Sequence, residues 1–599
     1  MLTRDRVHLG ALLAATAVLY LWNITINGTG NAFYAAAAWS GSRDVVAWLF
    51  GSLDPGNFIT VDKPPLSQWA MGLSGWAFGF SSASLLVPEA LMAVASVALL
   101  YGAVARLTNA GAGLLAGGVL ALMPVAALMF RFDNPDAAMV LAMTAAAYCT
   151  VRALGRRGGR WMAWAGVALG LAFLAKMGQG LLVAPSVVAT YLLASPVPVR
   201  RRLAHVAGCS AAAAVSAGWY VLLTMLWPAP SRPYIAGSVD NSFVNLAIGK
   251  NGASHLSGGH HGAQSAAWQS TPGLPRLFSG EIAAEIGWFL PAALLCLGYV
   301  LYTHRAAPRT DAVRAAAVLF GGWLLVGGAV LSFMPGNIHP YYCLCIAPAA
   351  AALVAVGVHT MRRQRHGRWV GAVVLLVSGV WAWRILGWNP QWMPTLRWIV
   401  LAASVTCTAL LALPVRCARN DSPGYTEPDQ HRSGWLPLAT VAGVAAVLLG
   451  PAAYTVATIG QPHDGGRPLA GPASSVRQAG VGGRFLAPPD DPAVDDALVH
   501  AGTQWSAAVI GSNEAAVLEL GSRTAVMAIG GYSGTDPVPS LAAFTGYVRD
   551  HRVRYFIVDP QGTKTGTHQD ITAWVESHFA LRRIGRDSVY DLDVPALEP

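Results

Sequence analysis

The stretch SLLVPEALMAVASVALLYGAVA at residues 84–105 is almost entirely apolar, and a basic residue, Arg106, follows it directly. A run of about 20 apolar residues is long enough for a helix to cross the hydrocarbon core of a bilayer. We therefore interpret residues 84–105 as a transmembrane helix and look for further segments of the same kind.

The composition of the whole chain agrees with a membrane protein. Hydrophobic residues make up 54% of the sequence and charged residues only 12%, which favours the bilayer as solvent. The run from Val7 to Ile26 follows two arginines and has no convincing cleavage site, so we interpret it as a first span and not as a signal peptide. About thirteen spans are predicted; the others lie near 84–105, 111–130, 136–152, 161–178, 180–195, 204–227, 283–303, 314–333, 341–360, 369–388, 397–415 and 435–458.

Basic residues occur mainly in alternate connections between these spans. A cytoplasmic N-terminus puts the basic clusters at 106, 152–160, 200–202, 305–314, 362–368 and 416–432 on the cytoplasmic side. This is the positive-inside pattern of a multi-pass plasma-membrane protein, and it accounts for the net charge of +10 without nucleic acid as a partner. An odd number of spans places the C-terminal region outside the cell.

Two outer connections are long, at residues 27–82 and 229–282, and long loops in compact proteins usually carry function. In the first, Asn31–Ser40 and Arg43–Phe50 are expected to form short amphipathic helices at the membrane interface.

The composition changes after Gly460, which divides the chain into a transmembrane domain at 1–460 and a linker plus soluble extracytoplasmic domain at 461–599. Gly, Pro and polar residues dominate Gln461–Asp491. Beyond it, apolar segments alternate with helical ones, which predicts a small α/β unit with parallel pairing. The expected strands are Ser506–Ile510, Thr524–Ile529 and Tyr555–Val558, and the expected helices lie near 538–550 and 568–579.

The first outer loop contains the residues best suited to chemistry. Transfer of a sugar from a phospholipid needs a carboxylate that accepts a proton and a cation that stabilises the departing phosphate. Asp62 and Asp54 are candidates for the base, and Lys63 for the cation. The structural alternative is a surface pair between Asp62 and Lys63 that caps a helix.

Several short motifs occur together in an order and spacing that resemble a known family. They are Asn31-Ala-Phe-Tyr34, Gly51-Ser-Leu-Asp54, Thr60-Val-Asp62-Lys63-Pro-Pro, Val87-Pro-Glu-Ala-Leu, Arg131-Phe-Asp-Asn-Pro-Asp136, Lys176-Met-Gly-Gln179, Arg232-Pro-Tyr234, His339-Pro-Tyr-Tyr342 and Gly530-Gly-Tyr-Ser-Gly-Thr-Asp536. Nearly the whole chain is similar to bacterial mannosyltransferases of the YkcA/YkcB type. These belong to the GT-C class, with the protein O-mannosyltransferases and the lipid A aminoarabinose transferases of family 39 type.

The resemblance implies a mainly α polytopic GT-C fold, an outward-facing site, a polyprenyl-phosphate sugar donor and inversion at the sugar carbon. Members of the class usually carry an acidic base early in the first outer loop, but this chain has Gly30 and Asn31 there. We therefore expect the base to be Asp62 or Asp54, with Asp133 and Asp136 next.

The resemblance also implies a donor-phosphate contact for Lys63 and a possible divalent metal at Asp62. Histidines of the fourth outer loop are the possible further ligands, although a solvated, flexible loop explains them as well: His255, His260 and His261.

Further polar residues on the outer side are candidates for the donor phosphate, each with a structural alternative. His339 and Tyr342 could instead be interfacial anchors, Lys176 could snorkel to the headgroups, and Asp136 could cap a helix. Arg232 and Tyr234 are a similar pair. In the soluble domain, Asp536 follows a glycine-rich loop and is a candidate acceptor-binding residue, although a turn explains the loop equally well.

The predicted function is transfer of a hexosyl or pentosyl group from a polyprenyl-phosphate donor to a hydroxyl of an extracytoplasmic glycan, lipid or protein. The alternative is a transporter or flippase of a lipid-linked sugar, which tends to show internal repeats that we do not find here.

Overall fold

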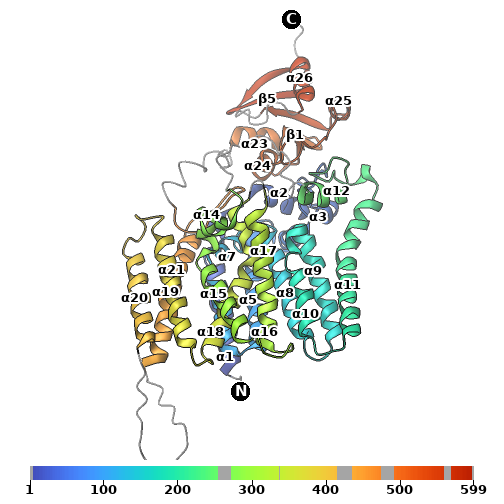
Figure 1. Ribbon diagram of the computed structural model, residues 1–599. Coiled ribbons are helices and arrows are strands. Elements are labelled where there is room, and N and C mark those ends of the chain that lie inside the picture. Colours follow the sequence, from blue (N-terminus) through green and yellow to red (C-terminus); the bar gives the residue numbers. More distant parts are fainter. Residues whose placement is uncertain are drawn as a thin grey trace, which may run out of the picture.

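In the computed structural model, a bundle of long helices carries a small α/β domain at one end, and the N-terminus lies at the other end (Figure 1). The structure describes residues 4–253, 271–335, 338–413, 435–473, 491–558 and 568–595.

The N-terminal half of the bundle contains helices that run through the bundle and helices that lie at the end next to the α/β domain (Figure 1). The first group consists of α1 Arg4–Leu21, α5 Ser82–Leu107, α6 Ala110–Ala121, α8 Asp136–Ala153, α9 Gly158–Gly180, α10 Ala184–Ala194 and α11 Val199–Leu226. The second group consists of α2 Ala32–Gly41, α3 Val45–Phe50, α4 Leu66–Phe78, α7 Pro124–Met129 and α12 Phe243–Asn245.

The second half of the bundle continues the same arrangement. Its helices are α14 Gly280–Ile282, α15 Leu290–Thr303, α16 Ala312–Ala316, α17 Gly322–Phe333, α18 Ala347–Met361, α19 Gly367–Leu386, α20 Leu396–Ala412 and α21 Trp435–Ile459. A 3-10 segment, Pro340–Ile346, leads into α18.

Within the described residues, eight helices are long and apolar enough to cross a membrane, or nine if a pair bent by 58°, Gly280–Gly287 and Leu290–Thr303, is one span. Three shorter apolar helices, α6, α10 and α20, accompany them. Each of the thirteen predicted ranges overlaps a helix, but the number of crossings is not confirmed as thirteen. The chain is a multi-pass membrane protein.

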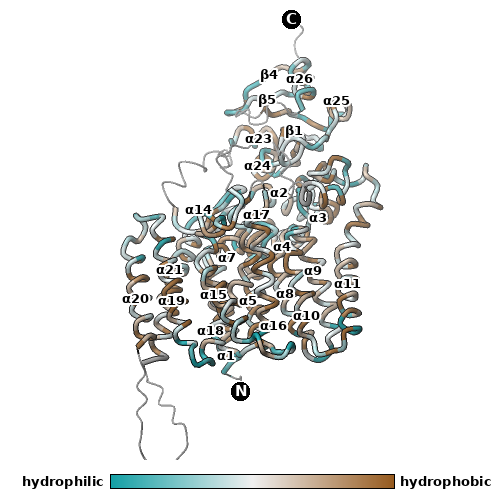
Figure 2. Tube along the Cα trace, in the orientation of Figure 1, coloured by the Kyte–Doolittle hydropathy of each residue, from teal (hydrophilic) through white to brown (hydrophobic). Residues whose placement is uncertain are grey.

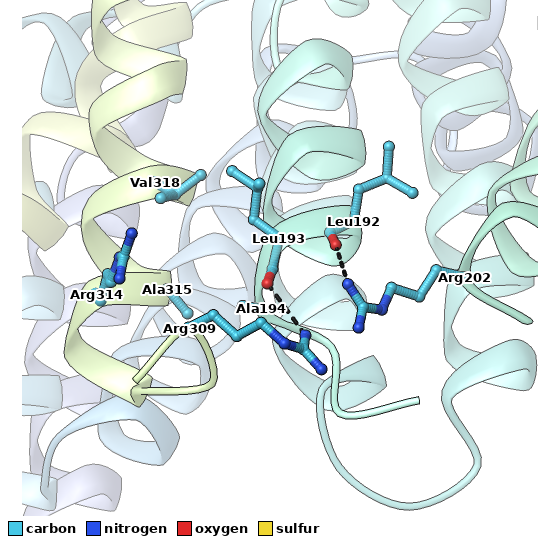
Figure 3. Close-up of a pocket in the computed structure, with 8 residues that line it drawn as sticks. All are labelled: Leu192, Leu193, Ala194, Arg202, Arg309, Arg314, Ala315 and Val318. Atoms are coloured by element: carbon cyan, nitrogen blue, oxygen red, sulfur yellow. Dashed lines mark hydrogen bonds between the residues drawn. The ribbon is translucent and has the colours of Figure 1, made fainter. Parts of the chain in front are cut away.

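Hydrophilic connections gather at the end of the bundle that holds the N-terminus (Figure 2). A cavity of about 190 Å³ lies there, where α10 ends and α16 begins. Figure 3 shows Arg202 and Arg309 donating to backbone carbonyls of α10, to Leu192 at 2.7 Å and to Leu193 at 3.3 Å. These guanidinium groups cap the C-terminal end of α10, far from the polar residues predicted for chemistry.

The α/β domain has a five-stranded sheet of order β2-β1-β3-β5-β4. The strands are β1 Trp505–Ile510, β2 Val526–Ile529, β3 Val553–Val558, β4 Phe579–Ile584 and β5 Asp587–Pro595. β1 pairs in parallel with β2 and β3, as predicted, whereas β5 pairs antiparallel with β3 and β4. Its helices are α23 Pro492–Val499, α24 Ser512–Ser522, α25 Leu541–Arg549 and α26 Gln569–His578.

The α/β domain shares one hydrophobic core with the first outer loop. Phe33, Leu53 and Phe58 from the loop pack in the same cluster as Trp505 and Val526 from the sheet. The predicted interfacial helix at Asn31–Ser40 is therefore wrong in its environment: α2 forms there, but residues 33–40 are buried. An interfacial helix would bury only one apolar face. The alanines of α2 are small on every face, so α4 and α24 can pack closely against different faces of the helix.

Candidate active site

A tight hairpin positions the Asp62–Lys63 motif. Gly51 adopts a positive φ of 67°, a conformation that favours glycine, and Ser52 forms an antiparallel bridge to Thr60. The amide of Val61 donates to the Gly51 carbonyl at 2.9 Å. These bonds end the hairpin just before Asp62, so the next two side chains have a fixed direction.

Asp62 and Lys63 lie against one another at the end of this hairpin. The Lys63 ammonium is 3.2 Å from Asp62 Oδ1 and donates to the Asp62 carbonyl at the same distance. Their side chains are only 11% and 15% exposed, respectively. This is not the solvated surface pair that we considered as the structural alternative.

A second acid–base pair joins two helices of the bundle. Lys176 Nζ lies 2.6 Å from Asp136 Oδ2, and the side chains are 6% and 0% exposed. The φ and ψ angles of Lys176 and Met177 depart from helical values and break α9 there. The break turns Lys176 inward, so it does not snorkel to the headgroups. Asp136 opens α8 after the N-cap Pro135 and uses its carboxylate for Lys176 and not for capping.

Aromatic rings surround the second pair. The Lys176 ammonium lies 4.0 Å from the ring centroid of Tyr342, a cation–π contact. His339 stacks on Tyr341 with centroids 5.1 Å apart and lies 5.2 Å from Tyr342. Burial, with Lys176, Arg467 and Lys63 nearby, lowers the pKa of His339 to about 3, so its imidazole is neutral at ordinary pH.

The two pairs belong to one electrostatic environment. Burial, and after it the charge of Asp62 and the nearby Tyr341 and Tyr342, raise the pKa of Tyr34 well above its usual range. Asp136 interacts with Lys63 as well as with Lys176. We call this set the polar cluster: Tyr34, Asp62, Lys63, Asp136, Lys176, His339, Tyr341 and Tyr342.

Asp54 lies outside the polar cluster, against the α/β domain. Its Oδ1 accepts from Trp505 Nε1 at 2.9 Å and its Oδ2 accepts from the Phe58 amide at 3.0 Å. The residue is fully buried, and burial raises its pKa to about 6 against the opposing effect of these hydrogen bonds. The contacts give Asp54 a role in joining the two domains.

Arg232, Tyr234 and Asp536 also take part in contacts that order the fourth outer loop. Arg232 donates to Asn241 Oδ1 at 2.7 Å, and the Tyr234 hydroxyl donates to the Ser238 carbonyl at 2.7 Å. Asp536 Oδ2 accepts from the Gly237 amide at 2.7 Å. The structure thus brings these three residues together with the loop and not into the polar cluster.

Two buried carboxyl groups beside Asp136 were ranked lower or missed. Asp133 accepts from the Asn31 amide at 2.7 Å, and burial raises its pKa well above the usual range. Glu89 in α5 is fully buried, interacts with both aspartates, and has no hydrogen-bond partner among the described residues. Glu89 could have been identified from the sequence, because it is an ionisable residue within the apolar run at 84–105.

No three His, Cys, Asp or Glu side chains of the described residues are grouped so that they could hold a metal ion. The candidate ligands His255, His260 and His261 lie outside the described residues.

Comparisons with known proteins agree with this architecture. Residues 62–220 match the family model described as dolichyl-phosphate-mannose-protein mannosyltransferase. Residues 498–578 match the model of the C-terminal region of YkcB-like mannosyltransferases.

Two relatives from Bacillus subtilis match along most of the chain. "Putative mannosyltransferase YkcB" is 26% identical over 95% of this chain and 90% of its own length, and "Putative mannosyltransferase YycA" is 25% identical over 95% and 93%. Among solved structures, ArnT from Cupriavidus metallidurans aligns over 97% of both chains, at a TM-score of 0.56 and 15% identity in the apo state. Its complex with undecaprenyl phosphate aligns at a TM-score of 0.55 and 16% identity. The chain therefore has the mainly helical membrane fold of the GT-C class that ArnT shows, and it is similar along most of its length to mannosyltransferases of the YkcB type.

Proposed function

We propose that the chain transfers a sugar, with inversion, from a polyprenyl-phosphate donor to a hydroxyl group of an extracytoplasmic acceptor. The bond between the sugar C1 and the phosphate oxygen breaks, and a bond forms between C1 and the acceptor oxygen. The acceptor proton goes to a protein carboxylate. The observation that carries this proposal is the convergence of Asp62 and Lys63 with Lys176 and Asp136 at the end of the bundle beneath the α/β domain.

The cations of the polar cluster suit a departing phosphate. Lys63 and Lys176 supply two ammonium groups in a largely water-excluded environment, where a fixed cation stabilises developing negative charge more than it does in water. His339 and Tyr342 can add hydrogen bonds to the phosphate oxygens. Arg232 and Tyr234, predicted for the same task, are already engaged in the fourth outer loop and are not needed for it.

Asp62 is the best candidate for the base. Both oxygens of Asp54 already accept hydrogen bonds, from Trp505 of the α/β domain and from the Phe58 amide, and these direct its carboxylate away from the polar cluster. Asp136 is held by Lys176 at 2.6 Å, a shorter ion pair than the 3.2 Å between Asp62 and Lys63, so its carboxylate is less free to turn toward an acceptor. We therefore assign the base to Asp62, with Asp136 as the second candidate.

The relatives support a lipid-linked donor. ArnT has been solved with undecaprenyl phosphate, and one matching family model is described by a dolichyl-phosphate-mannose reaction. We therefore propose a polyprenyl phosphomannose as donor, acting on the outer face of the plasma membrane with the N-terminus in the cytoplasm.

A divalent metal at Asp62 stays a separate proposal. Treatment with a chelator followed by addition of Mg²⁺, Mn²⁺ or Zn²⁺ tests it, because only a metal-dependent transferase loses activity and regains it with one ion.

Asp62→Asn and Lys63→Ala in the full-length protein test the site, with undecaprenyl phosphomannose as donor and membranes that contain the native acceptor. Loss of the base and loss of the phosphate cation should each lower the transfer rate by roughly 100-fold or more. Arg549 and Asp550 are a sequence-adjacent pair that is exposed on the α/β domain, so Asp550→Asn and Arg549→Ala are matched controls. Full activity of both site variants would refute the proposed function.

A further inference from the structure

The α/β domain extends one side chain toward the polar cluster. Tyr532 lies between Gly531 and Gly534, two glycines with positive φ angles of 67° and 74°. A Cβ at Gly531 would lie 2.1 Å from Asp536 Oδ2, so only glycine allows the chain to turn this closely. The turn aims Tyr532 away from the sheet, toward the bundle.

Contacts from the bundle side fix the ring of Tyr532. Its centroid lies 5.1 Å from that of Phe33 in an edge-to-face arrangement, and Phe33 lies 5.1 Å from Tyr34 of the polar cluster. A Cβ built on Gly466 would lie 3.4 Å from the Tyr532 hydroxyl. The neighbouring Gly465 amide donates to the Gly30 carbonyl at 3.1 Å. The segment after α21 thus passes beside this hydroxyl and returns to the first outer loop.

The side chain of Asn513 in α24 lies near the hydroxyl of Tyr532 and lowers its pKa. Burial raises the pKa of this hydroxyl, and Asp62 is the first of the nearby charges that raise it further. Tyr34 and Tyr342 also interact with it. Tyr532 is therefore a neutral donor that faces the polar cluster from the side of the α/β domain.

Three contacts hold the domain so that this placement persists. Asp536 accepts from Gly237, Trp505 donates to Asp54, and Ser40 donates to Glu519 Oε1 at 3.0 Å. Each joins the α/β domain to an outer loop of the bundle, and the shared hydrophobic core lies between them.

We propose that Tyr532 is an acceptor-binding residue that the α/β domain supplies to the membrane active site. This inference rests on the proposed function. The lipid and its phosphate reach the cluster from the bundle, where Lys176 of α9 lies opposite Lys63 of the first outer loop. Inversion requires the acceptor hydroxyl to attack the sugar from the side opposite the phosphate, and Tyr532 approaches the polar cluster from the α/β domain, whereas Lys176 approaches it from helix α9 of the bundle. Its phenol donates to the hydroxyl-bearing acceptor next to Asp62, and its ring suits the C–H face of a carbohydrate.

Tyr532→Phe in the full-length protein removes only the hydroxyl. With undecaprenyl phosphomannose and acceptor-containing membranes, we expect transfer to fall about tenfold at limiting acceptor and to recover as the acceptor is increased. Binding of undecaprenyl phosphate should change less than twofold. Tyr590→Phe removes a hydroxyl from β5 of the same domain and should leave both readouts unchanged.

The results separate this inference from the function on which it rests. If the wild type transfers the sugar and the Tyr532→Phe variant transfers it at the same rate at every acceptor concentration, the assignment of Tyr532 is wrong but the proposed function stands. An equal loss of undecaprenyl phosphate binding in that variant would also overturn it, because the residue would then serve the donor. Absence of transfer by the wild type would overturn the proposed function and the assignment together.

Discussion

The hydrogen bond from Trp505 to Asp54 joins the α/β domain to the first outer loop. Removing this one bond tests how firmly the domain is docked on the bundle. Trp505→Phe removes the indole N–H but retains an aromatic ring beside Phe58, whose centroid lies 5.9 Å away. A hydrogen bond to a charged group contributes about 1.5–3 kcal/mol, and a neutral one about 1 kcal/mol. The variant should therefore shift the docking equilibrium toward the undocked form by roughly 10- to 100-fold when Asp54 is ionised.

The dependence of docking on pH follows from the raised pKa of Asp54. Burial raises it from 3.8 to about 6, so the docked state favours the protonated carboxyl. The stability that this gives to the docked state is fully present below pH 3.8 and is lost as the pH rises through 6. The loss is at most about 3 kcal/mol. Because the lost hydrogen bond is stronger to a carboxylate, Trp505→Phe should undock the domain more at pH 8 than at pH 5.

Double electron–electron resonance between nitroxides at Val45 and His500 measures docking directly. Val45 is 75% exposed on the outer loop, and the His500 side chain is 73% exposed on the α/β domain. We expect a second, broad distance population in the variant at pH 8, and a smaller one at pH 5. Trp574→Phe is the matched control, because Trp574 packs on Phe544 within the domain. Identical distance distributions in the Trp505 variant and the wild type would refute the reasoning.

Two further changes test the buried contacts around the polar cluster. Lys176→Met leaves the Asp136 carboxylate buried without its cation, which should cost about 3–5 kcal/mol and lower the melting temperature. The double variant Lys176→Met with Asp136→Asn should recover most of the lost stability. An unchanged melting temperature in Lys176→Met would show that the buried ion pair does not stabilise the fold. Gly30→Ala places a Cβ 2.1 Å from Asp133 Oδ1 at a φ of 60° and should lower the melting temperature clearly more than Gly28→Ala, where φ is 56° and the same Cβ meets nothing. Equal effects of the two alanines would exclude the close approach.

The fold was predictable as far as it depends on local composition. The apolar runs, the change after Gly460 and the parallel strands follow from residue type and periodicity within one segment. The hairpin of β4 and β5 was not predicted, because Phe579–Ile584 carries two arginines and its exposed edge lacks the apolar alternation of a half-buried strand. The number of membrane crossings also depends on helix lengths and bends that a fixed window cannot see.

The candidate site was predictable residue by residue but not as a set of contacts. Asp62, Lys63 and Lys176 were singled out because ionisable groups near lipid are costly. The pairing of Lys176 with Asp136 needs a break in α9 at Lys176 and Met177. Gly178 and Gly180 indicate a helix end near this position, but not that the break would turn Lys176 toward Asp136. Asp54 was assigned to chemistry for its charge and its loop, because its partner Trp505 is about 450 positions away along the chain and belongs to a strand.

Asp54 and Asp62 lie in different places, so docking of the α/β domain and the chemistry of the polar cluster can be tested separately. Loss of either should lower the transfer rate. Asp54 holds the α/β domain in place, whereas Asp62 faces the cations of the polar cluster and, across it, Tyr532. Undocking withdraws Tyr532 and so lowers acceptor use, but it leaves Lys63 and Lys176 where they are. Trp505→Phe should therefore reduce transfer in the manner of Tyr532→Phe, with undecaprenyl phosphate still bound. Lys63→Ala should instead weaken that binding. If Trp505→Phe abolished lipid binding as well, the α/β domain would have to shape the donor side of the site, and the division between a donor side in the bundle and an acceptor side in the domain would be wrong.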